Sequence, residues 1–182
     1  MRFTDFLKAT VLTSAAAATL LAAITVVAAG SHDDPLLVPF AAGWWILAAA
    51  VGTTLGRRAE TSPPIARLLA AARSTKALPE VHPTRILFNR LWPLLLCTVA
   101  AGGLALVLPQ IAAIATGFAI IWALSWRRQD AAVTAIEERD GVRYYVERTS
   151  PLKPIQLLRT PGFKANVWQF EDAVEPTPAP RT

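Results

Sequence analysis

The sequence has little charge and almost no cysteine, and both shortages limit what the protein can be. Only 17% of its 182 residues are Asp, Glu, Lys or Arg, whereas soluble domains average about 25%. Its single cysteine, Cys97, excludes an intramolecular disulfide. Charged residues are absent from 9–32, 35–56 and 91–126. Apolar stretches of about 18 residues or more are typical of membrane spans, so the composition excludes a soluble enzyme with one water-facing surface.

The sequence also lacks the motifs that usually carry chemistry. No Gly-rich phosphate loop, Cys-x-x-Cys pair or His-Glu-x-x-His pattern occurs. His32, Asp33 and Asp34 adjoin one another, but three consecutive residues cannot easily surround one metal ion. Ionisable groups inside a bilayer usually mark transport or catalysis, and the apolar runs contain none at their centres. We therefore predict a non-enzymatic protein with no catalytic residue, no metal site and no cofactor.

Four apolar segments dominate what is present. As one helix, 91–126 would extend about 54 Å, against a hydrocarbon core of about 30 Å. We therefore expect a break at Pro109, because proline disfavours helix in the preceding residue; a re-entrant pair is the alternative. Residues 9–30 are too long for a secretory signal core, which favours a retained helix. The predicted fold class is an all-α membrane protein whose transmembrane bundle, residues 1–126, has spans at about 9–30, 36–56, 91–108 and 109–126.

The basic residues predict how these spans are oriented. With both termini in the cytoplasm, the cytoplasmic parts 1–8, 57–90 and 127–182 hold 2, 7 and 9 Lys or Arg, which are all 18 in the chain. Such an excess marks the cytoplasmic side. We predict a multi-pass protein of the cell membrane with cytoplasmic N- and C-termini. The net charge of +5 is then an orientation signal, and we expect no nucleic-acid partner.

Basic and aromatic residues flank the predicted spans at the inner interface, as in the aromatic belts of membrane proteins. These interface residues are Arg57, Arg58, Arg90, Trp92, Trp126, Arg127 and Arg128. We expect them to contact the lipid bilayer and its anionic inner-leaflet lipids. In the cytoplasmic loop 57–90, Ser62 and Pro63 predict the capped start of a short helix at this leaflet.

Small residues predict how the spans pack. Ala48, Gly52 and Gly56 follow one another at four-residue spacing, and Gly102 and Gly103 lie within the third span. Such residues let helix backbones approach closely. The contact predicted is either within the bundle or between two copies of the chain. Trp44 and Trp45 lie deeper in the second span, where helix packing or lipid contact is favoured over a ligand site.

The C-terminal part predicts a small cytoplasmic segment, 127–170, followed by a disordered, proline-rich tail, 171–182. Two structures remain open for 132–149. The favoured one is a β-hairpin that turns at Asp140-Gly141 and pairs Glu138 with Arg143 and Ile136 with Tyr145. The alternative is a helix that continues from the fourth span and stops at Gly141. A further short strand is expected at Ile155–Leu158.

The stretch from Glu138 to Phe163, which begins Glu-Arg-Asp-Gly-Val-Arg-Tyr-Tyr-Val, resembles the tails of small uncharacterised multi-pass membrane proteins of actinobacterial type. The resemblance implies no known activity and transfers no functional residue.

Clustered aromatic residues in this segment predict a contact with a protein partner. The candidates are Tyr144, Tyr145, Phe163 and Trp168. We predict a non-enzymatic accessory or scaffold protein that presents its cytoplasmic tail to a protein partner. The alternative is a small channel or carrier that works by self-association as a homo-oligomer.

Overall fold

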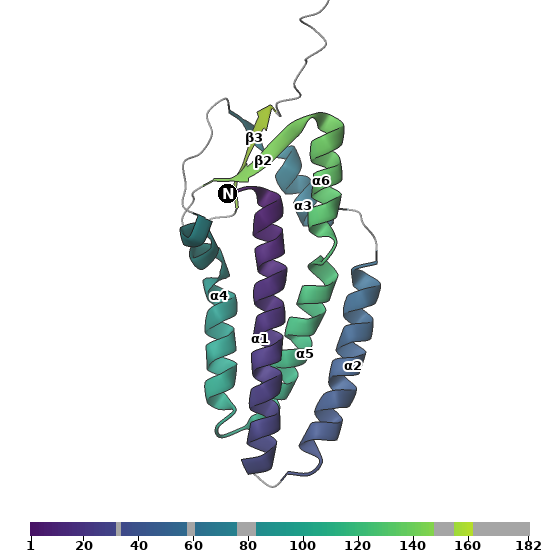
Figure 1. Cartoon of the computed structure of the whole chain (residues 1–182), viewed down its shortest axis with the longest axis vertical. Helices are drawn as coiled ribbons and strands as arrows, with labels where there is room; N and C mark the ends of the chain where they lie inside the picture. Colours follow the sequence, from purple (N-terminus) through teal and green to yellow (C-terminus); the bar gives the residue numbers. More distant parts are fainter. Residues whose placement is uncertain (32–33, 58–60, 76–82, 148–154, 162–182) are drawn as a thin grey trace, which may run out of the picture.

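Among the residues that the structure describes, four helices are long and apolar enough to cross a membrane. The computed structural model describes residues 1–31, 34–57, 61–75, 83–147 and 155–161. In chain order, its elements are α1 (Phe3–Ser31), α2 (Leu37–Leu55), α3 (Pro63–Ala70), β1 (Arg73–Ser74), α4 (Pro83–Leu104), α5 (Pro109–Trp126), α6 (Gln129–Asp140), β2 (Val142–Val146) and β3 (Leu157–Pro161). Helices α1, α2, α4 and α5 run side by side as the bundle, while α3, α6 and the strands gather at one end as the cap (Figure 1).

The predicted break in the third apolar run is confirmed. Leu108 has non-helical angles, φ −132° and ψ 85°, and α5 starts with Pro109 at its first turn. Proline suits that position because its missing N–H would have no helical partner there. The bounds of α5 match the predicted span, and α2 differs from it by one residue at each end. By contrast, α4 runs from Pro83 to Leu104, earlier than the predicted 91–108.

Helix α1 is longer than its predicted span because its first turns belong to the cap. Its 29 residues extend about 43 Å, more than a hydrocarbon core of about 30 Å requires. Phe3, Phe6 and Leu7 are buried in the cap core. The other buried members of this core are Ile65, Leu69, Ile86, Val133, Val142, Tyr144, Val146 and Leu157. The cap is therefore assembled around the N-terminal end of α1.

The cap sheet has the order β1-β3-β2, with β3 parallel to β1 and antiparallel to β2. The expected third strand is present, although it spans Leu157–Pro161 rather than 155–158. Inward-facing Val142, Tyr144 and Val146 alternate with outward-facing Arg143 and Tyr145 along β2, which is the period of a half-buried strand. The sheet therefore covers the cap core on one face only.

The predicted hairpin at Asp140-Gly141 is wrong. Residues 129–140 form α6, and Gly141 ends it with a left-handed φ of 63° and an N–H bond to the Glu137 carbonyl. Glycine favours both a helix end and a tight hairpin turn, because both need a positive φ. The helix forms because its turns bring Val133 and Glu137, four residues apart, to the same buried face. Strand β2 pairs with β3 instead.

Candidate functional site

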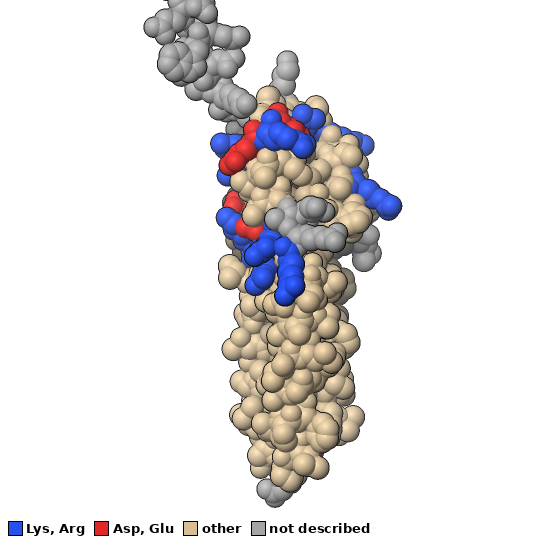
Figure 2. All heavy atoms as spheres, turned by 90° about the vertical axis from the view of Figure 1, so that its right-hand side faces the viewer, with Lys and Arg blue, Asp and Glu red and all other residues tan. Residues whose placement is uncertain are grey.

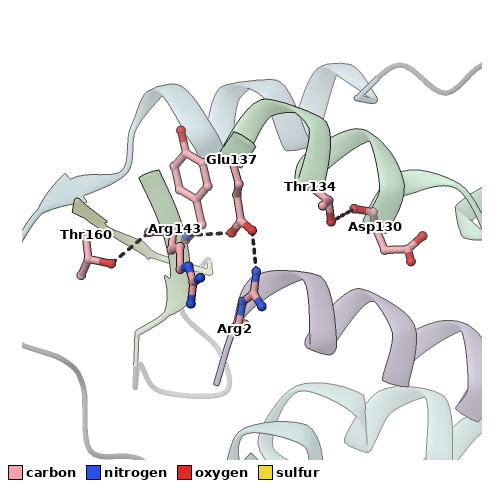
Figure 3. A network of polar contacts seen from close by, with 7 residues as sticks. Arg2, Asp130, Thr134, Glu137, Arg143 and Thr160 are labelled. Carbon is pink, nitrogen blue, oxygen red and sulfur yellow. Dashed lines mark hydrogen bonds and ion pairs between the residues drawn. The ribbon is translucent and has the colours of Figure 1, made fainter. Parts of the chain in front are cut away.

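The polar centre of the cap is the carboxylate of Glu137 on α6. One oxygen accepts a bond from Arg2 Nη2 at 2.9 Å, and the other accepts the Tyr144 backbone N–H at 2.9 Å (Figure 3). The Glu137 side chain is only 3% exposed, whereas that of Arg2 is 38% exposed. Burying a charge is tolerable when it is paired and hydrogen-bonded in this way. Because both oxygens are occupied, this carboxylate holds α1, α6 and β2 together.

The N-terminal residues also extend the sheet. Arg2 forms an antiparallel bridge with Tyr145, and the Val146 N–H donates to the Met1 carbonyl at 3.1 Å. The chain therefore runs beside β2 before it enters α1, and the outer edge of β2 is paired there. An edge strand without such pairing would be open to other strands.

Of the two predicted partner residues on β2, Tyr144 lies inside the cap and Tyr145 lies on its outer face. The Tyr144 side chain lies in the cap core, with the residue 4% exposed, because the alternation of β2 turns it inward; burial raises the pKa of its phenol. It is therefore unavailable to a partner. Tyr145 lies on the outer face, opposite Leu158 of β3, and both are half-buried. Phe163 and Trp168 lie outside the described residues.

The predicted interface residues fall at two places where the bundle meets the cap. Arg57 follows α2, Trp126 ends α5, and Arg127 and Arg128 connect α5 to α6. Arg128 Nη1 donates to the Arg57 carbonyl at 2.8 Å. On α4, Arg90 is half-buried and Trp92 is exposed. Arg58 lies outside the described residues. Figure 2 shows that, on the face it presents, Lys, Arg, Asp and Glu are confined to the cap end above an uncharged belt.

The predicted small-residue stripe faces α5. A Cβ on Gly52 would lie 2.9 Å from Leu124 Cβ, and a Cβ on Gly56 would collide with the Leu124 carbonyl oxygen. Ala48 on the same stripe is fully buried. Helix α2 therefore packs closely on α5 within one chain. A Cβ on Gly102 would approach Ile24 of α1 at 3.2 Å, while Gly103 has open space around it.

The α2–α5 contact includes residues that the sequence did not single out together. Trp44 Nε1 donates to the Ile114 carbonyl at 3.2 Å, and Trp45 Nε1 donates to the Ala113 carbonyl at 2.9 Å. Gly117 leaves the space for Trp44, because a Cβ at that position would overlap the indole ring. A glycine in the middle of an apolar span indicates that another helix approaches closely there. The position of Gly117 within residues 109–126 is therefore the sequence signal that could have pointed to this contact.

The described residues do not bring titratable side chains together as a catalytic or metal centre. No group of three His, Cys, Asp or Glu occurs among the described positions. In the bundle, the hydroxyls of Thr10, Ser14, Thr25 and Thr116 each donate to a carbonyl of their own helix, four residues earlier. Such bonds satisfy the hydroxyl locally.

Comparison with protein-family models, with curated proteins and with solved structures found no match to this chain. The resemblance of residues 138–163 to tails of actinobacterial-type membrane proteins stays a prediction.

Proposed function

We propose that this protein is a membrane-anchored accessory protein, in which the bundle spans the cell membrane and the cap presents a cytoplasmic surface to a protein partner. One observation carries the proposal. Large apolar side chains such as Phe40, Val99 and Leu106 point outward around the bundle, whereas those of the cap point inward. An outward apolar surface of this extent is stable in lipid and a liability in water. The two ends of the molecule therefore suit two different surroundings.

The charge distribution supports a cytoplasmic cap. Lys8, Arg57, Arg85 and Arg127 lie at or near the cap end of the four long helices, and basic residues flank spans on the cytoplasmic side. At the opposite end, the described part of the α1–α2 connection carries only the acidic Asp34, whose carboxylate accepts the backbone N–H groups of Leu36 and Leu37.

The surface offered to a partner is the outer face of the cap sheet. Tyr145 and Leu158 pair across β2 and β3 on that face, with the exposed Arg143 also on β2. Tyrosine and arginine are enriched at protein interfaces. The buried carboxylate of Glu137 supports the sheet from behind through the Tyr144 N–H. The surface therefore stands on a rigid base, which suits recognition better than a loop would.

Membrane orientation is tested by labelling single cysteines in intact cells, with Cys97 replaced by Ser. A cysteine at Ser31 is expected to react with an impermeant reagent from outside, and one at Ala165 only after the cells are opened. If the cysteine at position 165 is labelled from outside, the proposed orientation is contradicted; if alkaline carbonate releases the protein, the proposed membrane anchor is contradicted.

Partner binding is tested separately by co-purification in a mild detergent. Tyr145→Ser combined with Leu158→Ser is expected to remove the co-purifying protein. The matched control is Ala131→Ser combined with Ala135→Ser, at exposed positions of α6, and it should retain that protein. If the sheet variant retains every co-purifying protein, the sheet is not the partner surface.

A further inference from the structure

Three exposed arginines, Arg57, Arg127 and Arg128, lie just beyond the ends of α2 and α5. These two helix ends are close together because Gly56, without a side chain, lets the end of α2 touch α5 at Leu124. The Arg57 carbonyl then accepts the 2.8 Å bond from Arg128, and the Ser62 N–H donates to Gln129 Oε1 at 3.1 Å. These bonds fix the connection after α2 against the α5–α6 junction, so the cluster is part of the fold.

No carboxylate neutralises the cluster within the described part of the chain. The ion pairs found there are Arg2–Glu137 and Arg139–Asp140, and both lie elsewhere in the cap. The guanidinium groups of Arg57 and Arg127, and the N–H groups of Arg128 that do not bond to the Arg57 carbonyl, therefore remain available to an external anion. Figure 2 shows Lys and Arg side chains at the border between the charged cap and the uncharged belt, with Asp or Glu on their cap side.

An aromatic stripe continues from this cluster along the bundle. Phe118, Trp122 and Trp126 are four residues apart on α5, so they share one helix face. The rings of Trp122 and Trp126 stack at 5.4 Å between centroids, and Phe118 meets Trp44 edge-on at 5.7 Å. Trp122 is 48% exposed and Phe118 is also exposed. The stripe is about 12 Å long by helical rise. Its last ring, Trp126, is partly buried against the cap core and immediately precedes Arg127 in the chain.

We propose that the arginine cluster and the aromatic stripe together bind one anionic phospholipid. Its phosphate contacts Arg57, Arg127 and Arg128, and an acyl chain lies along Trp126, Trp122 and Phe118. Arginine suits phosphate because its planar group stays charged and donates two parallel hydrogen bonds. The charge at one end and the apolar stripe at the other match the two parts of such a lipid. The inference rests on the proposed membrane anchor, and does not depend on a protein partner.

The first test measures lipid retention by native mass spectrometry of the purified protein in mixed micelles. Phosphatidylglycerol is expected to stay bound when phosphatidylcholine does not. Arg127→Gln with Arg128→Gln should weaken that retention about fivefold for each arginine removed. The matched control, Arg139→Gln with Arg159→Gln, removes the same charge from exposed positions of α6 and β3 and should retain the lipid. Equal losses in the two double variants overturn the proposal, because net charge would then explain the binding.

Two further arms separate a lipid from its phosphate alone. Trp122→Ala is expected to weaken phosphatidylglycerol retention, whereas Trp92→Ala, at an exposed tryptophan of α4, should leave it unchanged.

Excess inorganic phosphate should not displace the lipid; displacement would show a simple anion site and overturn the proposal. Arg127→Lys with Arg128→Lys should restore part of the binding, which a variant that merely misfolds would not do. If the lipid is retained but no protein co-purifies, the proposed protein partner is contradicted and the lipid site is not.

Discussion

The bundle and the cap of this protein are packed in opposite ways. In the bundle, mostly small residues lie inside and most large apolar ones lie outside: Ala48 and Phe40 of α2 are 0% and 75% exposed. In the cap, Phe3, Leu7 and Val146 lie inside, and the charged residues Arg139 and Arg143 lie outside.

The difference follows from what drives each part together. Under the proposed membrane anchor, the cap lies in water, where burial of large apolar side chains stabilises it. The bundle then lies in lipid, which removes that driving force, so its helices associate through close backbone contact and hydrogen bonds between helices. The Gly52 and Gly117 contacts and the two indole bonds of α2 are of this second kind. An apolar core and one polar network hold the cap, and several small contacts hold the bundle.

The largest expected effect is in the cap. Glu137→Leu leaves the Arg2 guanidinium and the Tyr144 N–H without their acceptor. We expect a loss of about 3 kcal/mol in cap stability, at the lower end for a broken buried pair because Arg2 is partly exposed. Limited trypsin digestion should detect it as faster cleavage at Arg143 and Arg159 of the sheet.

The control removes both partners of that pair. Arg2→Leu combined with Glu137→Leu should recover part of the loss, because no unpaired charge remains. Unchanged cleavage in Glu137→Leu would show that the apolar core alone holds the cap. Simultaneous loss of the bundle would show that the two parts unfold as one unit.

The next effect breaks the bundle and spares the cap. Gly117→Ala places a methyl group where the Trp44 indole lies, and overpacking of this kind costs about 2 kcal/mol. Thermal unfolding in detergent should shift down, while trypsin cleavage of the sheet stays unchanged. Gly43→Ala is the matched control, because nothing lies within 4 Å of its Cβ position. It should be neutral or slightly stabilising, since alanine favours helix over glycine.

The bundle was more predictable from the sequence than the cap. Charge-free runs and Pro109 locate the long helices, because hydropathy and proline act locally. Ser62 and Pro63 likewise predicted the start of α3, although the Ser62 side chain makes no capping bond. The hairpin prediction failed because Gly141 suits two structures locally, and only burial of α6 against distant residues decides between them.

The residues of the candidate sites also differ in whether the sequence near them predicts their role. Arg127, Arg128 and Trp126 were predictable as interface residues, because they adjoin the end of a span. The Arg2–Glu137 pair joins residues 135 positions apart, and nothing local in the sequence connects them. The four-residue spacing of Phe118, Trp122 and Trp126 can be read from the sequence. Whether these rings are exposed depends on which face of α5 is left uncovered by α2, and the sequence does not show that.

A smaller effect tests whether hydrogen bonds between helices contribute to the bundle. Trp45→Phe keeps an aromatic ring and removes the indole N–H that donates to the Ala113 carbonyl. Such bonds contribute about 0.6 kcal/mol on average and up to about 1.7, so a modest fall in thermal stability in detergent is expected. Trp92→Phe, on the exposed face of α4, should cause none. Equal effects of the two substitutions would assign the loss to the change of ring.

The smallest expected effect distinguishes the two parts by pH. The Arg139 side chain donates to Asp140 at 2.8 Å, and this bond lowers the pKa of the Asp140 carboxyl. Its stabilisation is therefore present above the carboxyl's unfolded pKa and is lost as pH falls through the lower folded value. Since both side chains are exposed, the effect is small and salt should reduce it. Hydrogen-exchange protection of the cap amides, corrected for the intrinsic pH dependence of exchange, should fall on acidification less in Asp140→Asn than in the natural chain. Asp34, whose carboxylate accepts two N–H groups at the start of α2, is replaced by Asn in both chains. The thermal stability of the bundle should then not change over the same range, because residues 9–30, 37–56 and 91–126 contain no carboxylate; a parallel shift there would show that the cap controls the bundle.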